Sequence, residues 1–120
     1  MKPQLPPTIE KYVRATNGHD TASFLSPFDD NALVQDNGRE FRGTAAIKAW
    51  SEREIFAVQV SLDVIDFANR DGEAVITAKV DGTFDRTGLP DPLFIAHYFA
   101  IKDDKIVRLR CQLADEKKGN

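Results

Sequence analysis

The sequence contains only one cysteine and two histidines among its 120 residues. Cys111 alone cannot form an intramolecular disulfide, so nothing in the sequence indicates an oxidising compartment. The two histidines are far apart, and neither a His-x-x-x-His nor a Cys-x-x-Cys spacing occurs. Because such spacings mark the common histidine and cysteine metal sites, no metal is expected, and only sites made of carboxylates stay open.

Long apolar segments and an excess of positive charge are also missing. The longest apolar runs, near residues 58–60 and 93–96, are far shorter than the ~20 residues that cross a bilayer, and no signal-peptide pattern opens the chain. Sixteen Lys and Arg are scattered among nineteen Asp and Glu, for a net charge of −3. A nucleic-acid backbone would find no concentrated positive field. We therefore expect a cytoplasmic protein that binds neither membranes nor nucleic acid.

A chain of this length has room for one hydrophobic core, because domains cluster near ~100–150 residues. Its 42% hydrophobic and 29% charged residues are typical of a globular protein. No repeat or linker divides the sequence, so one domain over residues 1–120 is expected. Neither a glycine-rich phosphate loop nor a Gly-x-Ser-x-Gly motif occurs, which leaves nucleotide cofactors and a hydrolase elbow without support. No cofactor is predicted.

Helical spacing of apolar residues is confined to the first half of the chain. Asn17-Gly18 is placed to end a first helix, and Asp20 is placed to cap a second. Trp50 lies on the apolar stripe of the third helix and should point into the core. We expect these helices near residues 9–16, 20–28 and 44–54.

Alternation of apolar and polar residues predicts the strands. Asn37-Gly38 is a strong hairpin signal and joins the first two strands. The alternation slips by one residue at Val64-Ile65, where a β-bulge is expected. A longer loop is expected over residues 85–92, which are rich in Gly, Pro and Asp. The expected strands cover residues 32–36, 39–42, 58–67, 73–84, 93–101 and 106–114.

Helices followed by a strongly curved, mainly antiparallel sheet define an α+β layout in which the helices cover one face of the sheet. The concave face would then enclose a pocket. The strands at residues 58–67 and 93–101 are apolar on both sides, so the convex face needs a cover as well. The available cover is a second copy of the chain, and we predict a homodimer through the convex sheet face.

The order of these elements and four local motifs resemble the nuclear transport factor 2-like superfamily, a cystatin-like α+β cone. The resemblance is greatest to its ketosteroid isomerase and SnoaL-like branch and runs from residue 9 to the end. It implies a conical α+β barrel with three N-terminal helices packed on the sheet. Members of the superfamily use this pocket in different ways: some are isomerases, cyclases, hydrolases or dehydratases, and others only bind a ligand. The motifs are Tyr12-Val13, residues 28–32, residues 34–36 and residues 43–47.

The resemblance also implies site residues. In ketosteroid isomerase an Asp base moves a proton beside a carbonyl, while a Tyr and a protonated Asp bind the enolate oxygen. Asp36 stands at the position of the base, and Tyr12 stands at that of the tyrosine. The second donor, one residue before a His, is replaced by Ala96. Losing such a donor costs about 10²–10³ in rate, and Tyr98 on the same strand face is the candidate replacement.

The pocket wall is expected to be aromatic. The resemblance places Phe28 and Trp50 at wall positions, although buried aromatic residues on helices usually serve packing. His97 falls on the other face of its strand and is expected at the dimer interface. A hydrophobic small molecule suits such a cavity. Alternate residues of the strand at 93–101 would line its remaining side, namely Phe94, Ala96 and Tyr98.

Two functional hypotheses remain open. In the first, the protein is an isomerase of the ketosteroid isomerase type, or a related lyase or cyclase, in which Asp36 removes a proton beside a carbonyl and Tyr12 holds the enolate. In the second, it is a non-catalytic ligand-binding domain, and Asp36 is a turn residue. A third interpretation, a dimerising adaptor, requires a cone filled by Trp50, Phe28 and Tyr98.

Overall fold

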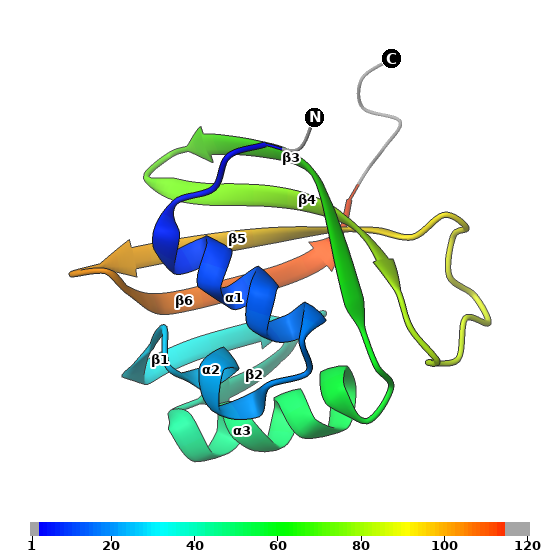
Figure 1. Ribbon diagram of the computed structural model, residues 1–120, viewed down its shortest axis with the longest axis horizontal. Helices are drawn as coiled ribbons and strands as arrows, with labels where there is room; N and C mark the ends of the chain where they lie inside the picture. The colour runs from blue at the N-terminus through cyan, green and yellow to red at the C-terminus, as the bar shows by residue number, and fades with distance from the viewer. Residues whose placement is uncertain (1–2, 115–120) are drawn as a thin grey trace.

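The computed structural model describes residues 3–114 as a curved sheet with helices on its concave side (Figure 1). None of the helices in this part of the chain is long and apolar enough to span a membrane. The helices are α1 (Pro7–Asn17), α2 (Thr21–Leu25) and α3 (Thr44–Ser51), which continues into the π-helix η1 (Glu52–Phe56). The strands are β1 (Phe28–Asp36), β2 (Arg39–Arg42), β3 (Ser61–Arg70), β4 (Glu73–Asp81), β5 (Phe94–Lys102) and β6 (Lys105–Leu113).

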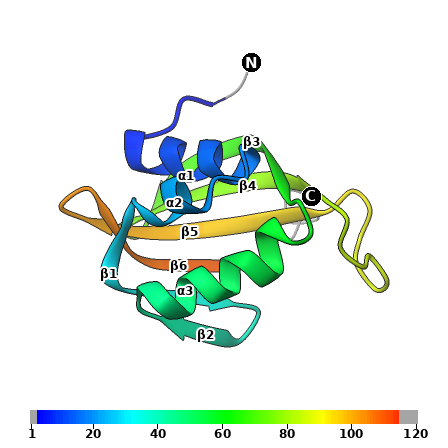
Figure 2. The ribbon, with the colours of Figure 1, turned by 60° about the horizontal axis from the view of Figure 1, so that its bottom comes forward.

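The strands form one sheet in the order β2-β1-β6-β5-β4-β3. All neighbours in it are antiparallel except β1 and β6, which run parallel. The sheet does not close into a barrel, and β2 and β3 are its edges. In Figure 2 the sheet curves around the helices, with α1 and α2 in the upper part of the view and α3 beside β1 and β2 in the lower part, and α2 also contacts α3. The α+β class predicted from the sequence is confirmed.

Helix α1 aims its apolar stripe at the concave face of the sheet. Pro7 occupies the first turn, where a missing N–H costs little. At the other end, Asn17 Nδ2 donates to the Leu62 carbonyl over 3.0 Å, and the Leu62 N–H donates to Asn17 Oδ1 over 2.7 Å. This paired bond fastens the end of α1 to the start of β3. The orientation buries Ile9 and Tyr12.

Helix α3 starts where β2 ends and lies against β1 and β2. Gly43 precedes it with a φ of +91°, a conformation that favours glycine. The Gly43 N–H donates to the Ala32 carbonyl over 2.9 Å and holds the start of the helix on β1. Trp50 is consequently 3% exposed, as the sequence predicts.

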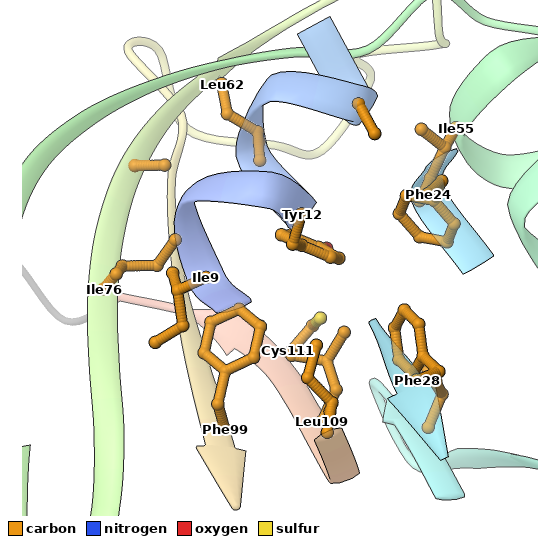
Figure 3. Close-up of a cluster of buried hydrophobic side chains, with 14 of the residues drawn as sticks. Ile9, Tyr12, Phe24, Phe28, Ile55, Leu62, Ile76, Phe99, Leu109 and Cys111 are labelled. Carbon is orange, nitrogen blue, oxygen red and sulfur yellow. The ribbon is translucent and has the colours of Figure 1, made fainter. Parts of the chain in front are cut away.

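The core lies between the helices and the sheet and combines aliphatic side chains with a group of aromatic rings around Tyr12 (Figure 3). The ring of Tyr12 lies 5.1 Å from that of Phe24 and 5.2 Å from that of Phe99, between centroids. Phe24 belongs to α2, whose first turn is capped by Asp20 as predicted, with the Ser23 N–H donating to Oδ1 over 3.2 Å. Tilted and edge-on ring pairs of this kind stabilise a core beyond the area they bury.

Several elements begin or end elsewhere than predicted. Helix α2 ends at Leu25 rather than near residue 28, and β1 begins at Phe28 rather than at residue 32. Strand β3 starts at Ser61, because residues 57–59 form a turn in which the Val60 N–H bonds the Ile55 carbonyl over 2.9 Å. The bulge after Val64 is confirmed. Strand β4 ends at Asp81 rather than at residue 84. The outward positions of β3 include exposed acidic residues, so the convex face is not the continuous apolar surface that the sequence suggested.

Candidate functional site

Three titratable side chains form a row across the concave face of the sheet. Asp36, at the end of β1, is the register partner of Cys111 in β6. Cys111 is in turn the register partner of His97 in β5. Since neighbouring strands lie ~4.8 Å apart, the three residues are side by side. Tyr12 reaches over this row from α1, and Figure 3 shows its ring and Cys111 facing the same interior space.

Asp36 lies at the rim of the core, where its side chain is 24% exposed. Trp50 Nε1 donates to Asp36 Oδ2 over 3.0 Å. Arg39 Nη2 donates to the same oxygen over 3.1 Å, and Arg39 Nη1 bonds Glu54 over 3.2 Å. Within the described residues both donors end on Oδ2, so neither occupies Oδ1. The carboxylate is thereby held in a fixed orientation with one oxygen free of these two bonds.

Both aromatic residues that were predicted to form the wall are buried, but Phe28 is the first residue of β1, whereas the sequence predicted it on the second helix. Trp50 stacks on Phe41 of β2 with 6.1 Å between ring centroids. Phe28 is 7% exposed and contacts the ring of Tyr12 edge-on at 6.2 Å. The structure therefore brings Tyr12, Asp36, Phe28 and Trp50 together around one interior region.

The predicted faces of β5 were wrong. His97 and Phe99 point toward α1, with ring centroids 6.1 and 5.2 Å from that of Tyr12. Residues alternate across a strand, so Tyr98 points outward, where the Arg110 guanidinium lies 4.0 Å from its ring. Tyr98 cannot replace the missing donor inside the cone. The other residues expected to line the cone from β5, Phe94 and Ala96, also belong to the outer face.

This error has a physical cause. Strand β5 is apolar on both sides, so its alternation does not show which face is inside. The outer face carries a shallow hollow of about 370 Å³ that includes Ala96 and Tyr98. The interior residue of β5 that sequence reasoning missed is His97. Two features of the sequence could have pointed to His97: it is a histidine in an otherwise apolar strand, and it directly follows Ala96, the position of the family's second donor.

Burial keeps the interior groups neutral in neutral solution. The pKa of the Tyr12 hydroxyl is raised well above its usual value by burial and, further, by its neighbours Cys111 and Asp36. Burial and then the charge of Asp36 also raise the pKa of the Cys111 thiol. Burial lowers the pKa of His97 to about 4, although the Ile95 carbonyl opposes this shift. Across residues 3–114, no three or more His, Cys, Asp or Glu side chains form a group that could hold a metal ion.

An open, curved sheet wrapped around three helices, with polar groups on its concave face, is the cone of the nuclear transport factor 2-like proteins. The sequence matches the SnoaL-like domain family over residues 9–109, and the protein belongs to this family. No curated protein matches the sequence.

Solved structures with the same fold include proteins of several descriptions. A candidate polyketide cyclase from Sinorhizobium meliloti has 29% identity and a TM-score of 0.80, over 90% of this chain and 95% of that one. A protein of ketosteroid isomerase-like fold from Catenulispora acidiphila, in complex with trimethylamine, has 17% identity and a TM-score of 0.76, over 91% and 86%. TerC, co-crystallised with polyporic acid, has 16% identity and a TM-score of 0.75, over 93% and 92%.

Proposed function

We propose that the protein binds an uncharged, hydrophobic carbonyl compound inside the cone and moves a proton beside its carbonyl group. Asp36 is the general base, and Tyr12 is a hydrogen-bond donor to the substrate oxygen. The base takes a proton from the carbon next to the carbonyl, the electron pair forms an enolate, and the same proton returns to a different carbon. The reaction is an isomerisation without net oxidation.

The observation that carries this proposal is the meeting of a fixed carboxylate and a protonated phenol in aromatic surroundings. Trp50 and Arg39 both bond Asp36 Oδ2, so a proton would be accepted on Oδ1. Burial keeps the pKa of Tyr12 high, so the phenol stays a donor. Phe28 and Trp50 supply apolar surface, and such surface with a few placed polar groups suits a small hydrophobic ligand.

A second candidate, a non-catalytic ligand-binding domain, is favoured by one contact. Arg39 pairs with both Asp36 and Glu54. This ion pair gives the carboxylate a structural role at the hairpin turn that requires no chemistry. In that case a ligand would occupy the same interior region, but no proton would move.

Exchange of Asp36 for asparagine separates the two candidates. Wild-type protein should convert 3-cyclohexenone to its conjugated isomer faster than buffer does, measured by the rise in ultraviolet absorbance. Asp36→Asn should lower the rate by about 10²–10⁴, because the amide cannot accept the proton. Asp71→Asn is a matched control, since Asp71 is an exposed residue before a glycine in the turn between β3 and β4.

The outcomes differ for each hypothesis. If Asp36→Asn isomerises the ketone as fast as the wild type, and both exceed buffer, Asp36 is not the base. If ketones and lactones raise the thermal stability of the wild type but none is turned over, ligand binding without catalysis is the function, since a ligand of the native state stabilises it.

We also propose that the protein is a homodimer through the outer face of β4, β5 and β6. Charges of both signs meet there, with Arg108 2.7 Å and Arg110 3.5 Å from Glu73. A face with both signs can complement its own copy across a twofold axis. Light scattering should give twice the chain mass of 13.4 kDa, and Tyr98→Glu should lower it toward one chain. A monomeric wild type would refute the dimer.

The cytoplasmic location and the one-domain organisation stay predictions.

A further inference from the structure

His97 is a polar residue in the core with an unsatisfied nitrogen. The residue is 5% exposed, and its buried Nδ1 makes no hydrogen bond of normal geometry in the described part of the chain, although the Ile95 carbonyl lies close enough to the imidazole to oppose the lowering of its pKa. Buried polar atoms of this kind are rare in folded proteins, because leaving them unpaired costs free energy. Such an atom is well suited to a ligand that supplies the missing partner.

The surroundings of His97 place that nitrogen within the candidate site. Its ring centroid lies 6.1 Å from that of Tyr12, at an angle of 66°. Phe99 lies nearly parallel to the imidazole, with 6.3 Å between centroids and 13° between planes. Across the sheet, Cys111 separates His97 from Asp36. The imidazole, the phenol ring and the carboxylate therefore share the concave face of the sheet.

The imidazole is neutral when the protein is in neutral solution, since burial lowers its pKa to about 4. A neutral imidazole has one N–H donor and one acceptor nitrogen. Its register partners are Cys111, a protonated thiol, and the apolar Ile76, and Tyr12 above it is a protonated phenol. A donor in these surroundings gains strength when negative charge develops on the oxygen that it binds.

We propose that His97 is the second hydrogen-bond donor to the substrate oxygen, beside Tyr12, in place of the donor that Ala96 cannot provide. This inference rests on the proposed function. His97 keeps its proton throughout, and only the carbon-bound proton moves, to Asp36 and back. The pair of neutral donors selects a ligand with an uncharged carbonyl or hydroxyl oxygen at this point of the cone.

The first test uses two probes of the same shape, 4-methylphenol and 1,4-dimethylbenzene. The phenol carries an oxygen that can meet both donors, whereas the hydrocarbon carries none. Wild-type protein should bind the phenol at least tenfold more tightly, a factor that corresponds to one ordinary hydrogen bond. His97→Leu should lose most of this preference, and His97→Gln, which keeps a neutral donor, should retain most of it.

The second test needs no variant. Protein labelled with ¹⁵N at histidine has two residues to observe, His19 and His97. Addition of 4-methylphenol should shift the ring nitrogens of His97 and leave those of His19, which is exposed in a turn, in place. The hydrocarbon should shift the His97 nitrogens much less.

The results distinguish this inference from the proposed function. If 3-cyclohexenone is isomerised equally well by wild type and by His97→Leu, His97 is not a donor, and the assignment of Asp36 stands. If the ketone is not isomerised but the phenol shifts the His97 nitrogens, His97 contacts the ligand, and catalysis is refuted. A wild type with no preference for the phenol, or with unshifted His97 nitrogens, overturns the inference.

Discussion

Replacement of Phe99 by alanine should lower the free energy of unfolding by about 3–5 kcal/mol, the range found for deleting a buried aromatic ring. Phe99 is fully buried in β5. Its ring packs edge-on against Tyr12 and nearly parallel to His97. The substitution therefore leaves a cavity at the centre of the concave face and removes two ring contacts. Urea unfolding, followed by far-ultraviolet circular dichroism, measures the loss.

A matched control lies on the same strand. Phe94 has the same side chain but is half-buried on the outer face of β5. Phe94→Ala should cost less than half as much as Phe99→Ala, provided both are measured at one protein concentration, since a dimer's stability depends on concentration. Equal losses for the two variants would mean that the faces of β5 are assigned wrongly.

The elements with strong local signals could be predicted from the sequence. Asn37-Gly38 specifies a tight turn by backbone conformation alone, and the structure has a hairpin there. The apolar stripe that contains Tyr12 specifies the buried side of α1. Boundaries were less accurate, because η1 and the turn after it depend on packing that apolar spacing does not encode.

The candidate site could be predicted only in part. Resemblance to a family placed Tyr12 and Asp36, and the structure brings them to one interior region. The bond from Trp50 to Asp36 depends on the direction of a side chain across two elements, which sequence spacing does not give. The inward position of His97 depends on which face of β5 meets α1, and a strand that is apolar on both faces leaves that choice to the tertiary packing.

Burial of His97 should also make the protein sensitive to acid. An unfolded histidine has a pKa of ~6.5, whereas burial lowers the pKa of folded His97 to about 4. Between these values the unfolded chain binds a proton that the folded protein does not bind, so stability falls as the pH falls. The loss begins near the unfolded pKa and is complete below the folded one. At about 1.4 kcal/mol per pKa unit, it amounts to about 3 kcal/mol.

Comparison with His97→Gln isolates this effect. Urea unfolding across the window from about pH 6.5 to 4 should give a declining free energy for the wild type and a much flatter one for the variant. Carboxylates such as Glu54, whose pKa is lowered first by its bond to Arg39, contribute stability when charged and lose it at still lower pH. They act equally in both proteins and cancel in the difference. Parallel curves for the two proteins would show that the imidazole is hydrated in the folded state. The argument that His97 is a neutral donor beside Tyr12 would then fail.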